Sequence, residues 1–194
     1  MEEMNAKVID SENEKIENPA SEFSATCFDW LESLVQALVL VVAIMAFFFR
    51  PISVIGTSML NTLHDADKVI VWKYGYVPKD GDVVVISPVK DLKEAIIKRV
   101  IATEGQTLSI DFSDGSVTVD GKKLDEPYIR ERMWLQGDGE IPSVIPEGYT
   151  FVMGDNRNGS MDSRFEAVGL IPNDKIIGKA TFLIFPFNRM GVIH

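Results

Sequence analysis

The chain has 194 residues, of which 46% are hydrophobic, so it is long enough and apolar enough for one folded domain and a smaller segment. Its net charge of −10 argues against a nucleic-acid partner, because phosphate binding requires clustered basic residues. The one cysteine, Cys27, and the two histidines, His64 and His194, argue against a disulfide framework, a thiolate or histidine metal site and a Ser-His-Asp triad. We therefore expect no metal and no cofactor.

The charges divide the chain into three segments. Residues 1–29 carry eight acidic residues and two lysines, residues 30–50 carry one acid and one arginine, and residues 51–194 carry 20 acids and 16 bases. The first segment also contains no glycine and shows no hydrophobic periodicity. We predict that residues 1–29 form a mobile acidic tail.

Residues 31–49 form an apolar stretch whose length as a helix, about 28 Å, matches the hydrocarbon core of a bilayer. Trp30 and Arg50 flank this stretch as interfacial anchors would. We predict a transmembrane anchor over residues 30–50, with a buried core helix and a cleaved secretory signal as alternatives. The acidic preceding segment and the lack of a small-x-small site after the stretch argue against the signal. The flanking charges do not settle the orientation.

The region after residue 50 has the composition of a β domain. It contains all 14 glycines, and its β-branched runs are separated by turn signals such as Asp114-Gly115. The pattern predicts a mainly β fold for residues 51–194, with a smaller β subdomain inserted at about 105–148. Strands are expected at residues 68–72, 82–86, 95–102, 107–112, 116–119, 150–153, 175–178 and 179–185.

The first candidate for chemistry is Ser58, in the run Gly56-Thr57-Ser58-Met59 just after the predicted span. A glycine two positions before a serine permits a sharp turn that exposes the hydroxyl and leaves backbone N–H groups free to face an oxyanion. A serine in a turn is more often only a turn residue. This run alone therefore leaves both interpretations open.

The second candidate is a lysine inside the apolar run of residues 95–101. In a strand, Lys98 shares a face with Ile96 and Val100, so it has an apolar neighbour two residues away on each side. Burial penalises the ammonium form, and a neutral lysine can act as general base toward a serine where no histidine is available. The alternative is a charged residue that protects an edge strand.

The third candidate is the polar run of residues 154–164. It does not fit a calcium loop, because its glycine falls one position too early and an arginine occupies a ligand position. We interpret it as a loop that satisfies its own charges, in which Asp155, Asp162, Arg157 and Arg164 pair. The alternative is a solvated charged turn.

Together these features resemble the type I signal peptidases, also called leader peptidases, which are membrane-anchored serine proteases with a Ser–Lys dyad. The likeness covers about residues 30–192, and the polar run is its most specific element. The matching runs, in the order of the family, are Gly56-Thr57-Ser58-Met59, Gly81-Asp82-Val83-Val84, Lys98-Arg99-Val100 and residues 154–164.

The resemblance implies a role for five residues. Ser58 matches the nucleophile, and Lys98 matches the general base that later protonates the departing amine. Ser160 matches a hydroxyl that orients the lysine, while Asp162 and Arg164 match a supporting ion pair.

The sequence departs from the family pattern at two positions. Some members use a serine side chain two residues before the nucleophile as an oxyanion donor, and here that position is Gly56. The backbone N–H of Ser58 would then carry more of the stabilisation. Asn61 stands where the family usually has proline, which concerns the local turn and leaves the dyad intact.

The resemblance also implies a fold, a location and a substrate. It implies an all-β catalytic domain of two parts with mixed antiparallel sheets, outside the plasma membrane, with residues 1–29 in the cytoplasm. Secretory precursors would be cut after small residues, and we expect a monomer that contacts membrane lipid. Val54, Met59 and Ile97 are our candidates for the walls of the substrate pockets. The rival hypotheses are a tethered β-domain that binds extended peptides without cutting them and a self-cleaving Ser–Lys protease.

Overall fold

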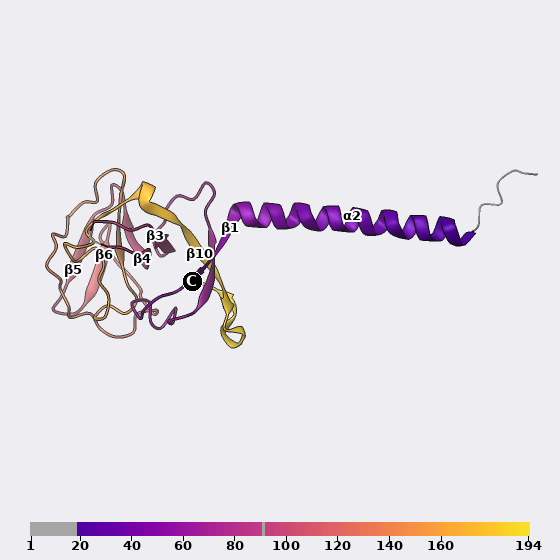
Figure 1. Ribbon diagram of the computed structural model, residues 1–194. Helices are drawn as coiled ribbons and strands as arrows, with labels where there is room; N and C mark the ends of the chain where they lie inside the picture. The colour runs from indigo at the N-terminus through magenta and orange to yellow at the C-terminus, as the bar shows by residue number, and fades with distance from the viewer. Residues whose placement is uncertain (1–18, 91) are drawn as a thin grey trace, which may run out of the picture. The chain divides into compact units, whose positions relative to one another are not determined.

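The computed structural model describes residues 19–90 and 92–194, in two compact units with a boundary between Ala46 and Phe47. Helix α2 (Pro19–Phe48) runs without interruption (Figure 1); it forms the described part of the first unit and ends two residues into the second. Its segment Thr26–Phe48 is long and apolar enough to cross a membrane, and no other helix in the described ranges is.

The helix begins earlier than the predicted anchor, so residues 19–29 of the expected acidic tail are helical, and residues 1–18 lie outside the described residues. That residues 1–29 form a mobile tail stays a prediction. Pro19 is the first helical residue, where its fixed φ and missing N–H are tolerated, and no glycine or proline follows until Pro51. The helix also ends earlier than expected, because strand β1 (Phe49–Ser53) takes up the residues around Pro51.

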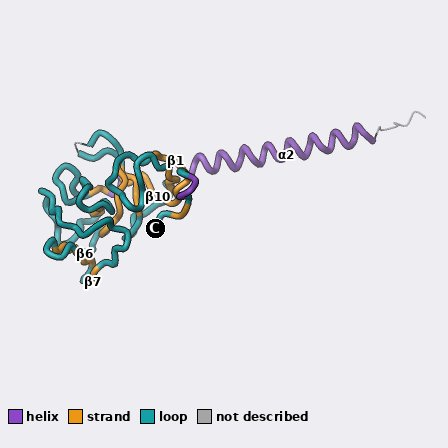
Figure 2. The backbone as a smooth tube through the Cα atoms, turned by 90° about the horizontal axis from the view of Figure 1, so that it is seen from below, coloured by secondary structure: helices purple, strands orange, loops and turns teal. Residues whose placement is uncertain are grey.

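The second unit, Phe47–His194, is mainly β, as predicted. Its strands are joined by long loops, which Figure 2 shows in teal. The larger sheet has eight strands in the order β1-β2-β10-β3-β4-β8-β9, with β11 paired to β10, and every pairing is antiparallel. Besides β1, its strands are β2 (Lys68–Trp72), β3 (Val83–Ile86), β4 (Ile96–Thr103), β8 (Tyr149–Met153), β9 (Ile171–Pro172), β10 (Ile176–Phe185) and β11 (Gly191–Val192). Two short 3-10 helices, Asn173–Lys175 and Phe187–Arg189, flank β10.

A smaller sheet lies between β4 and β8 in the sequence, inside the region where a subdomain was expected. It consists of β5 (Leu108–Asp111), β6 (Ser116–Val119) and β7 (Lys122–Lys123), paired in that order. Leu108 and Val117 of this sheet share one buried cluster with Ile101 and Phe151 of the larger sheet. The two sheets therefore pack against one another through a common core.

The runs expected at 175–178 and 179–185 form the single strand β10, whose pairing with its neighbours shifts register at several points. The strand passes so close to β2 that a Cβ at Gly178 would lie 2.0 Å from the carbonyl oxygen of Trp72. The glycine thus permits an approach of two backbones, and does not mark a turn.

Three segments of the second unit bring the candidate residues together. Strand β4 lies inside the larger sheet, between β3 and β8. Residues 54–67 connect β1 to β2, and residues 154–164 follow β8 directly.

Candidate active site

Ser58 lies in a tight turn between β1 and β2. Gly56 has a φ of +86°, a conformation that favours glycine, and its N–H donates to Asp65 Oδ1 at 2.8 Å. Met59, next to the serine, is buried, so the turn is fixed to the core while Ser58 itself is half-buried. The predicted sharp turn is therefore present.

Lys98 lies in the middle of β4 opposite Val84 of β3, and only 3% of it is exposed. Its Nζ is 2.7 Å from Ser58 Oγ and 3.1 Å from the carbonyl oxygen of Ile97. Because β4 has a partner strand on each side, the alternative of an edge-strand lysine does not hold. The fold thus brings the hydroxyl and the amine, 40 positions apart in sequence, into hydrogen-bond contact.

Burial lowers the pKa of the Lys98 amine to about 8. The charges of Asp162 and Asp155 act in the opposite direction, since a nearby carboxylate favours the ammonium form, and that of Arg164 acts with burial. Desolvation is the largest of these effects. A substantial fraction of the amine is therefore neutral near pH 8, as a general base requires.

Asp162 and Arg164 form a fully buried ion pair in the loop after β8. The Nε of Arg164 donates to Asp162 Oδ1 at 2.8 Å, and Nη2 donates to Oδ2 at 2.8 Å. The backbone N–H of Gly154 donates to the same carboxylate at 3.0 Å. The expected pairing of these two residues is present, and their support of the dyad stays a prediction.

The other expected pairing within this loop is wrong, because Asp155 and Arg157 each pair with a residue outside it. Asp155 accepts two hydrogen bonds from Arg99 of β4, Nε–Oδ1 at 2.8 Å and Nη2–Oδ2 at 2.7 Å. Arg157 binds Glu126 with an Nη2–Oε1 distance of 2.6 Å. The strand pairing of β4 with β8 brings Arg99 to the start of the loop, which no local pattern could show.

The Arg99–Asp155 pair was missed by the sequence analysis. The guanidinium of Arg99 lies 3.9 Å from the ring centroid of Tyr128, and Thr62, four residues after Ser58, donates from its hydroxyl to Asp155. The pair thus links the strand of the lysine to the turn of the serine. Its one signal in the sequence is an arginine directly after Lys98 in an apolar run.

Ser160 is 4% exposed, and its Oγ is the one buried side-chain polar atom in the described part of the chain without a hydrogen-bond partner. It packs against Gly154, where an added Cβ would lie 2.3 Å from Ser160 Oγ and 2.4 Å from the carbonyl oxygen of Ser58. Ser160 is therefore packed against the backbone that surrounds the dyad. Its predicted role in orienting Lys98 stays a prediction.

Val54, Met59 and Ile97 belong to one buried cluster beside the dyad. They are 4%, 2% and 8% exposed, so little of their surface is available to a ligand in this conformation. Their assignment to the walls of substrate pockets stays a prediction.

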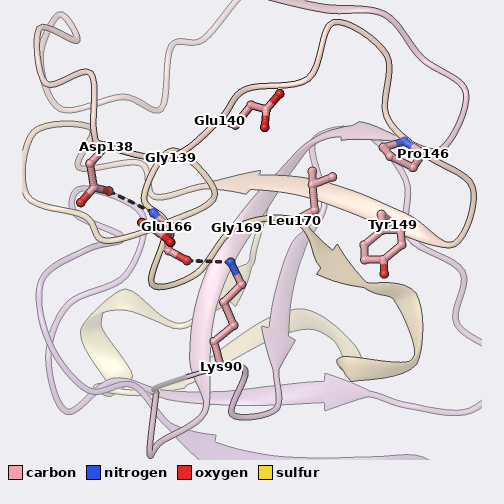
Figure 3. Close-up of a pocket in the computed structure, with 9 residues that line it drawn as sticks. All are labelled: Lys90, Asp138, Gly139, Glu140, Pro146, Tyr149, Glu166, Gly169 and Leu170. Atoms are coloured by element: carbon pink, nitrogen blue, oxygen red, sulfur yellow. Dashed lines mark hydrogen bonds between the residues drawn. The ribbon is translucent and has the colours of Figure 1, made fainter.

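A separate cavity of about 730 Å³ contains none of the candidate residues. Figure 3 shows how Lys90 reaches the carbonyl oxygen of Glu166 there, at 2.6 Å, and how Asp138 accepts from the Glu166 N–H at 3.0 Å. The other residues that line the cavity are Gly139, Glu140, Pro146, Tyr149, Gly169 and Leu170.

Comparison with known proteins identifies the family. Residues 27–185 match the family model described as signal peptidase, peptidase S26. The chain belongs to this family. Signal peptidase I T of Bacillus subtilis (strain 168) is 37% identical over 193 residues, which cover 94% of this chain and 98% of that protein. Signal peptidase I of Bacillus licheniformis is 41% identical over 175 residues, which cover 84% and 91%.

A crystal structure of a signal peptidase I from Enterococcus faecalis V583 is 26% identical, with a TM-score of 0.45, and covers 55% of this chain and 98% of that one. Membership of the S26 family confirms the resemblance found in the sequence and makes the chain a serine endopeptidase. Together with the apolar helix, it indicates a membrane-anchored enzyme. The rival hypothesis of a β-domain that only binds peptides is not favoured, nor is that of a self-cleaving protease.

Proposed function

We propose that this signal peptidase cleaves signal peptides from secretory precursors with Ser58 as nucleophile and Lys98 as general base. The observation that carries the assignment is the 2.7 Å contact between Lys98 Nζ and Ser58 Oγ, made by an amine that burial keeps partly neutral near pH 8. A lysine can replace histidine as the base only if its pKa is lowered in this way.

In the first half of the reaction, the neutral Lys98 amine takes the proton of the Ser58 hydroxyl while Oγ attacks the carbonyl carbon of the scissile bond. The resulting ammonium then protonates the departing amine of the mature protein, and an acyl-enzyme ester remains. In the second half, Lys98 takes a proton from water, the hydroxide attacks the ester, and Ser58 recovers its proton.

The charge on the tetrahedral intermediate falls on the carbonyl oxygen of the substrate. We assign its stabilisation to the backbone N–H of Ser58, which donates to no group in the described ranges. Because position 56 is glycine, no side-chain hydroxyl assists from there.

The supporting residues act on the amine. The Asp162–Arg164 pair keeps a carboxylate near Lys98, which limits how far burial lowers its pKa and favours the ammonium once it has formed. Ser160 orients the Lys98 amine through its buried hydroxyl, which has no hydrogen-bond partner in the described part of the chain.

The proposal includes the placement of the enzyme and its substrate. Residues 1–29 lie in the cytoplasm, and residues 51–194 act outside the plasma membrane as a monomer, with residues 105–148 as the smaller β subdomain. The precursor binds as an extended strand beside Ile97, and Val54, Met59 and Ile97 restrict the positions before the cut to small side chains.

The test is cleavage of a purified precursor by wild type, Ser58→Ala and Lys98→Ala. We expect both variants to lose roughly a thousandfold or more in rate, as in other serine proteases that lose a member of the catalytic group. Lys122→Ala, which removes an exposed lysine, serves as the matched control and should cleave normally. If either dyad variant retains the wild-type rate, the assignment is wrong.

A further inference from the structure

We propose that Asn156 is a positioning residue that aims the backbone N–H of Ser58 at the oxyanion of the substrate. The proposal rests on the proposed function, because it takes Ser58 as the nucleophile and its N–H as the donor. It concerns a residue of the polar loop to which neither the sequence nor the dyad geometry assigns a role.

Asn156 holds the peptide groups on both sides of Ser58. Its backbone N–H donates to the carbonyl oxygen of Ser58 at 3.0 Å, and its side-chain Nδ2 donates to the carbonyl oxygen of Thr57 at 3.1 Å. Asn156 is 6% exposed, so water competes little for these bonds. One residue of the loop after β8 therefore fixes the backbone that carries the nucleophile.

The hydrogen bond from the Asn156 side chain fixes the direction of the Ser58 N–H, because that N–H belongs to the same peptide group as the Thr57 carbonyl. The Thr57–Ser58 bond is trans, so the C=O of Thr57 and the N–H of Ser58 point in opposite directions within one plane. A rotation of this plane that moves the carbonyl oxygen away from Asn156 also turns the N–H away from its target. The Leu60 N–H reaches the same oxygen at 3.3 Å within the turn, so the Asn156 amide provides the shorter of two bonds.

The orientation of the Ser58 N–H matters more in this protein because Gly56 offers no second oxyanion donor. Gly56 provides no hydroxyl, and the Ser58 N–H has no other acceptor among the described residues. Donors that are already oriented stabilise a transition state without reorganisation during the reaction. Loss of the orientation should therefore slow catalysis more than it weakens substrate binding.

Gly159 provides the space that the Asn156 amide occupies. A Cβ at position 159 would lie 2.5 Å from Asn156 Nδ2 and 3.0 Å from its Cγ. The amide would have to move away from position 159 to relieve this contact. Gly159→Ala thus displaces the same group that Asn156→Ala removes.

The experiment compares full-length wild type and Asn156→Ala on a soluble peptide substrate and two inhibitors of the same sequence. A peptide aldehyde forms a tetrahedral hemiacetal with Ser58 and places its oxygen at the oxyanion position, while the corresponding alcohol binds without reacting. We expect kcat and the affinity for the aldehyde to fall together by roughly 10- to 100-fold. The KM and the affinity for the alcohol should change by less than about twofold, and the midpoint of the pH–rate profile should not move.

Two further variants serve as a second test and as a control. Gly159→Ala should show the same pattern to a smaller extent, and it carries the test if Asn156→Ala folds poorly. Asn158→Ala is the matched control, because the Asn158 amide lies in the same loop but binds the backbone N–H groups of Trp134 and Leu135 at 2.9 and 3.1 Å. Asn158→Ala should retain wild-type kcat.

Three results would overturn the inference: wild-type turnover in Asn156→Ala, unchanged affinity for the aldehyde when turnover falls, and equal weakening of aldehyde and alcohol. The last would mean that Asn156 shapes the binding site and does not direct the donor. Ser58→Ala in the same assay separates the two proposals. Normal cleavage by that variant contradicts the proposed function, whereas a normal Asn156→Ala beside an inactive Ser58→Ala contradicts this inference alone.

Discussion

At the scale of single residues, Lys98 is a basic side chain in a buried position. It is 3% exposed in the middle of the larger sheet, and its two hydrogen bonds join it to neutral oxygens. An ammonium in such a place loses most of its hydration, so burial lowers its pKa. The same burial that makes the lysine a base must then make it costly for stability.

The first prediction concerns the pH dependence of the reaction. Since only the neutral amine accepts the Ser58 proton, kcat/KM on a soluble peptide should rise with pH and reach half its plateau near pH 8, where the lowered pKa of Lys98 lies. A profile from pH 6 to 10.5 would measure it. A midpoint near the pKa of free lysine, with no activity near neutrality, would contradict the buried neutral base.

The second prediction concerns the cost of Lys98. Because its pKa is lower in the folded than in the unfolded chain, folding releases a proton between about pH 8 and 10.5, and the folded state carries the full cost of the buried ammonium below about pH 8. Lys98→Met keeps most of the volume without the charge, so it should be inactive but more stable at pH 7 by about 1 to 3 kcal/mol.

The free energy of unfolding from denaturant titration tests this prediction. The gain of Lys98→Met over wild type should shrink as pH rises from about 8 to 10.5 and level off above that range, where the amine is neutral in both states. A gain that is independent of pH would show that packing, and not the titration of Lys98, causes it.

At the scale of elements, the loop of residues 154–164 depends on partners from other segments. Arg157 is fully buried and pairs with Glu126, which lies in the segment between β7 and β8. Arg164 donates to the carbonyl oxygen of Leu135 in the same segment, at 2.7 Å. The segment between β7 and β8 therefore holds the loop of residues 154–164 in place.

The third prediction is that Glu126→Ala destabilises the second unit by about 3 to 5 kcal/mol, because it leaves the Arg157 guanidinium buried without its counter-ion. The double variant Glu126→Leu/Arg157→Met should recover much of this loss, since two apolar side chains can replace a buried pair. Thermal or denaturant unfolding measures both.

The exposed pair between Lys123 and Asp114 offers a matched control, and Lys123→Ala should leave the stability almost unchanged. A similarly small loss in Glu126→Ala would mean that Arg157 is well satisfied by its bond to the Gly154 carbonyl oxygen alone.

The elements that the sequence predicts are those with a strong local pattern. The β-branched runs at β2 and β6 lie at the predicted positions, and the turn at Gly56 forms as expected. Strands β1, β9 and β11 were missed because they are short or contain proline, and they form only because a neighbouring strand pairs with them.

In the candidate site, too, features with a local pattern could be predicted, and contacts between distant segments could not. Ser58 and Lys98 each had a common alternative interpretation, and only the family resemblance selected them from the sequence. The partners of Asp155 and Arg157 could not be predicted, because they depend on which strands and loops the sheet order places side by side.

At the scale of the whole molecule, the described part of the chain consists of a helix long and apolar enough to cross a membrane and a compact unit that holds the dyad. The unit includes β1, whose five residues all pair with β2 from Phe49 to Ser53. A truncation that starts after the predicted anchor at residue 50 would remove part of this strand. The cut that leaves the unit whole falls after Ala46.

The fourth prediction compares the full chain with one that lacks residues 1–46. An anchor confines the enzyme and a membrane-inserted precursor to the same surface, which raises their effective concentration without any new contact. We expect the truncation to slow cleavage of a precursor in vesicles by at least about tenfold, and cleavage of a soluble peptide by less than about twofold. An unrelated apolar helix of the same length in place of α2 should restore the rate in vesicles. Equal losses on both substrates would contradict this prediction. They would mean that the helix supports the fold of the catalytic unit and does not act by concentrating enzyme and precursor.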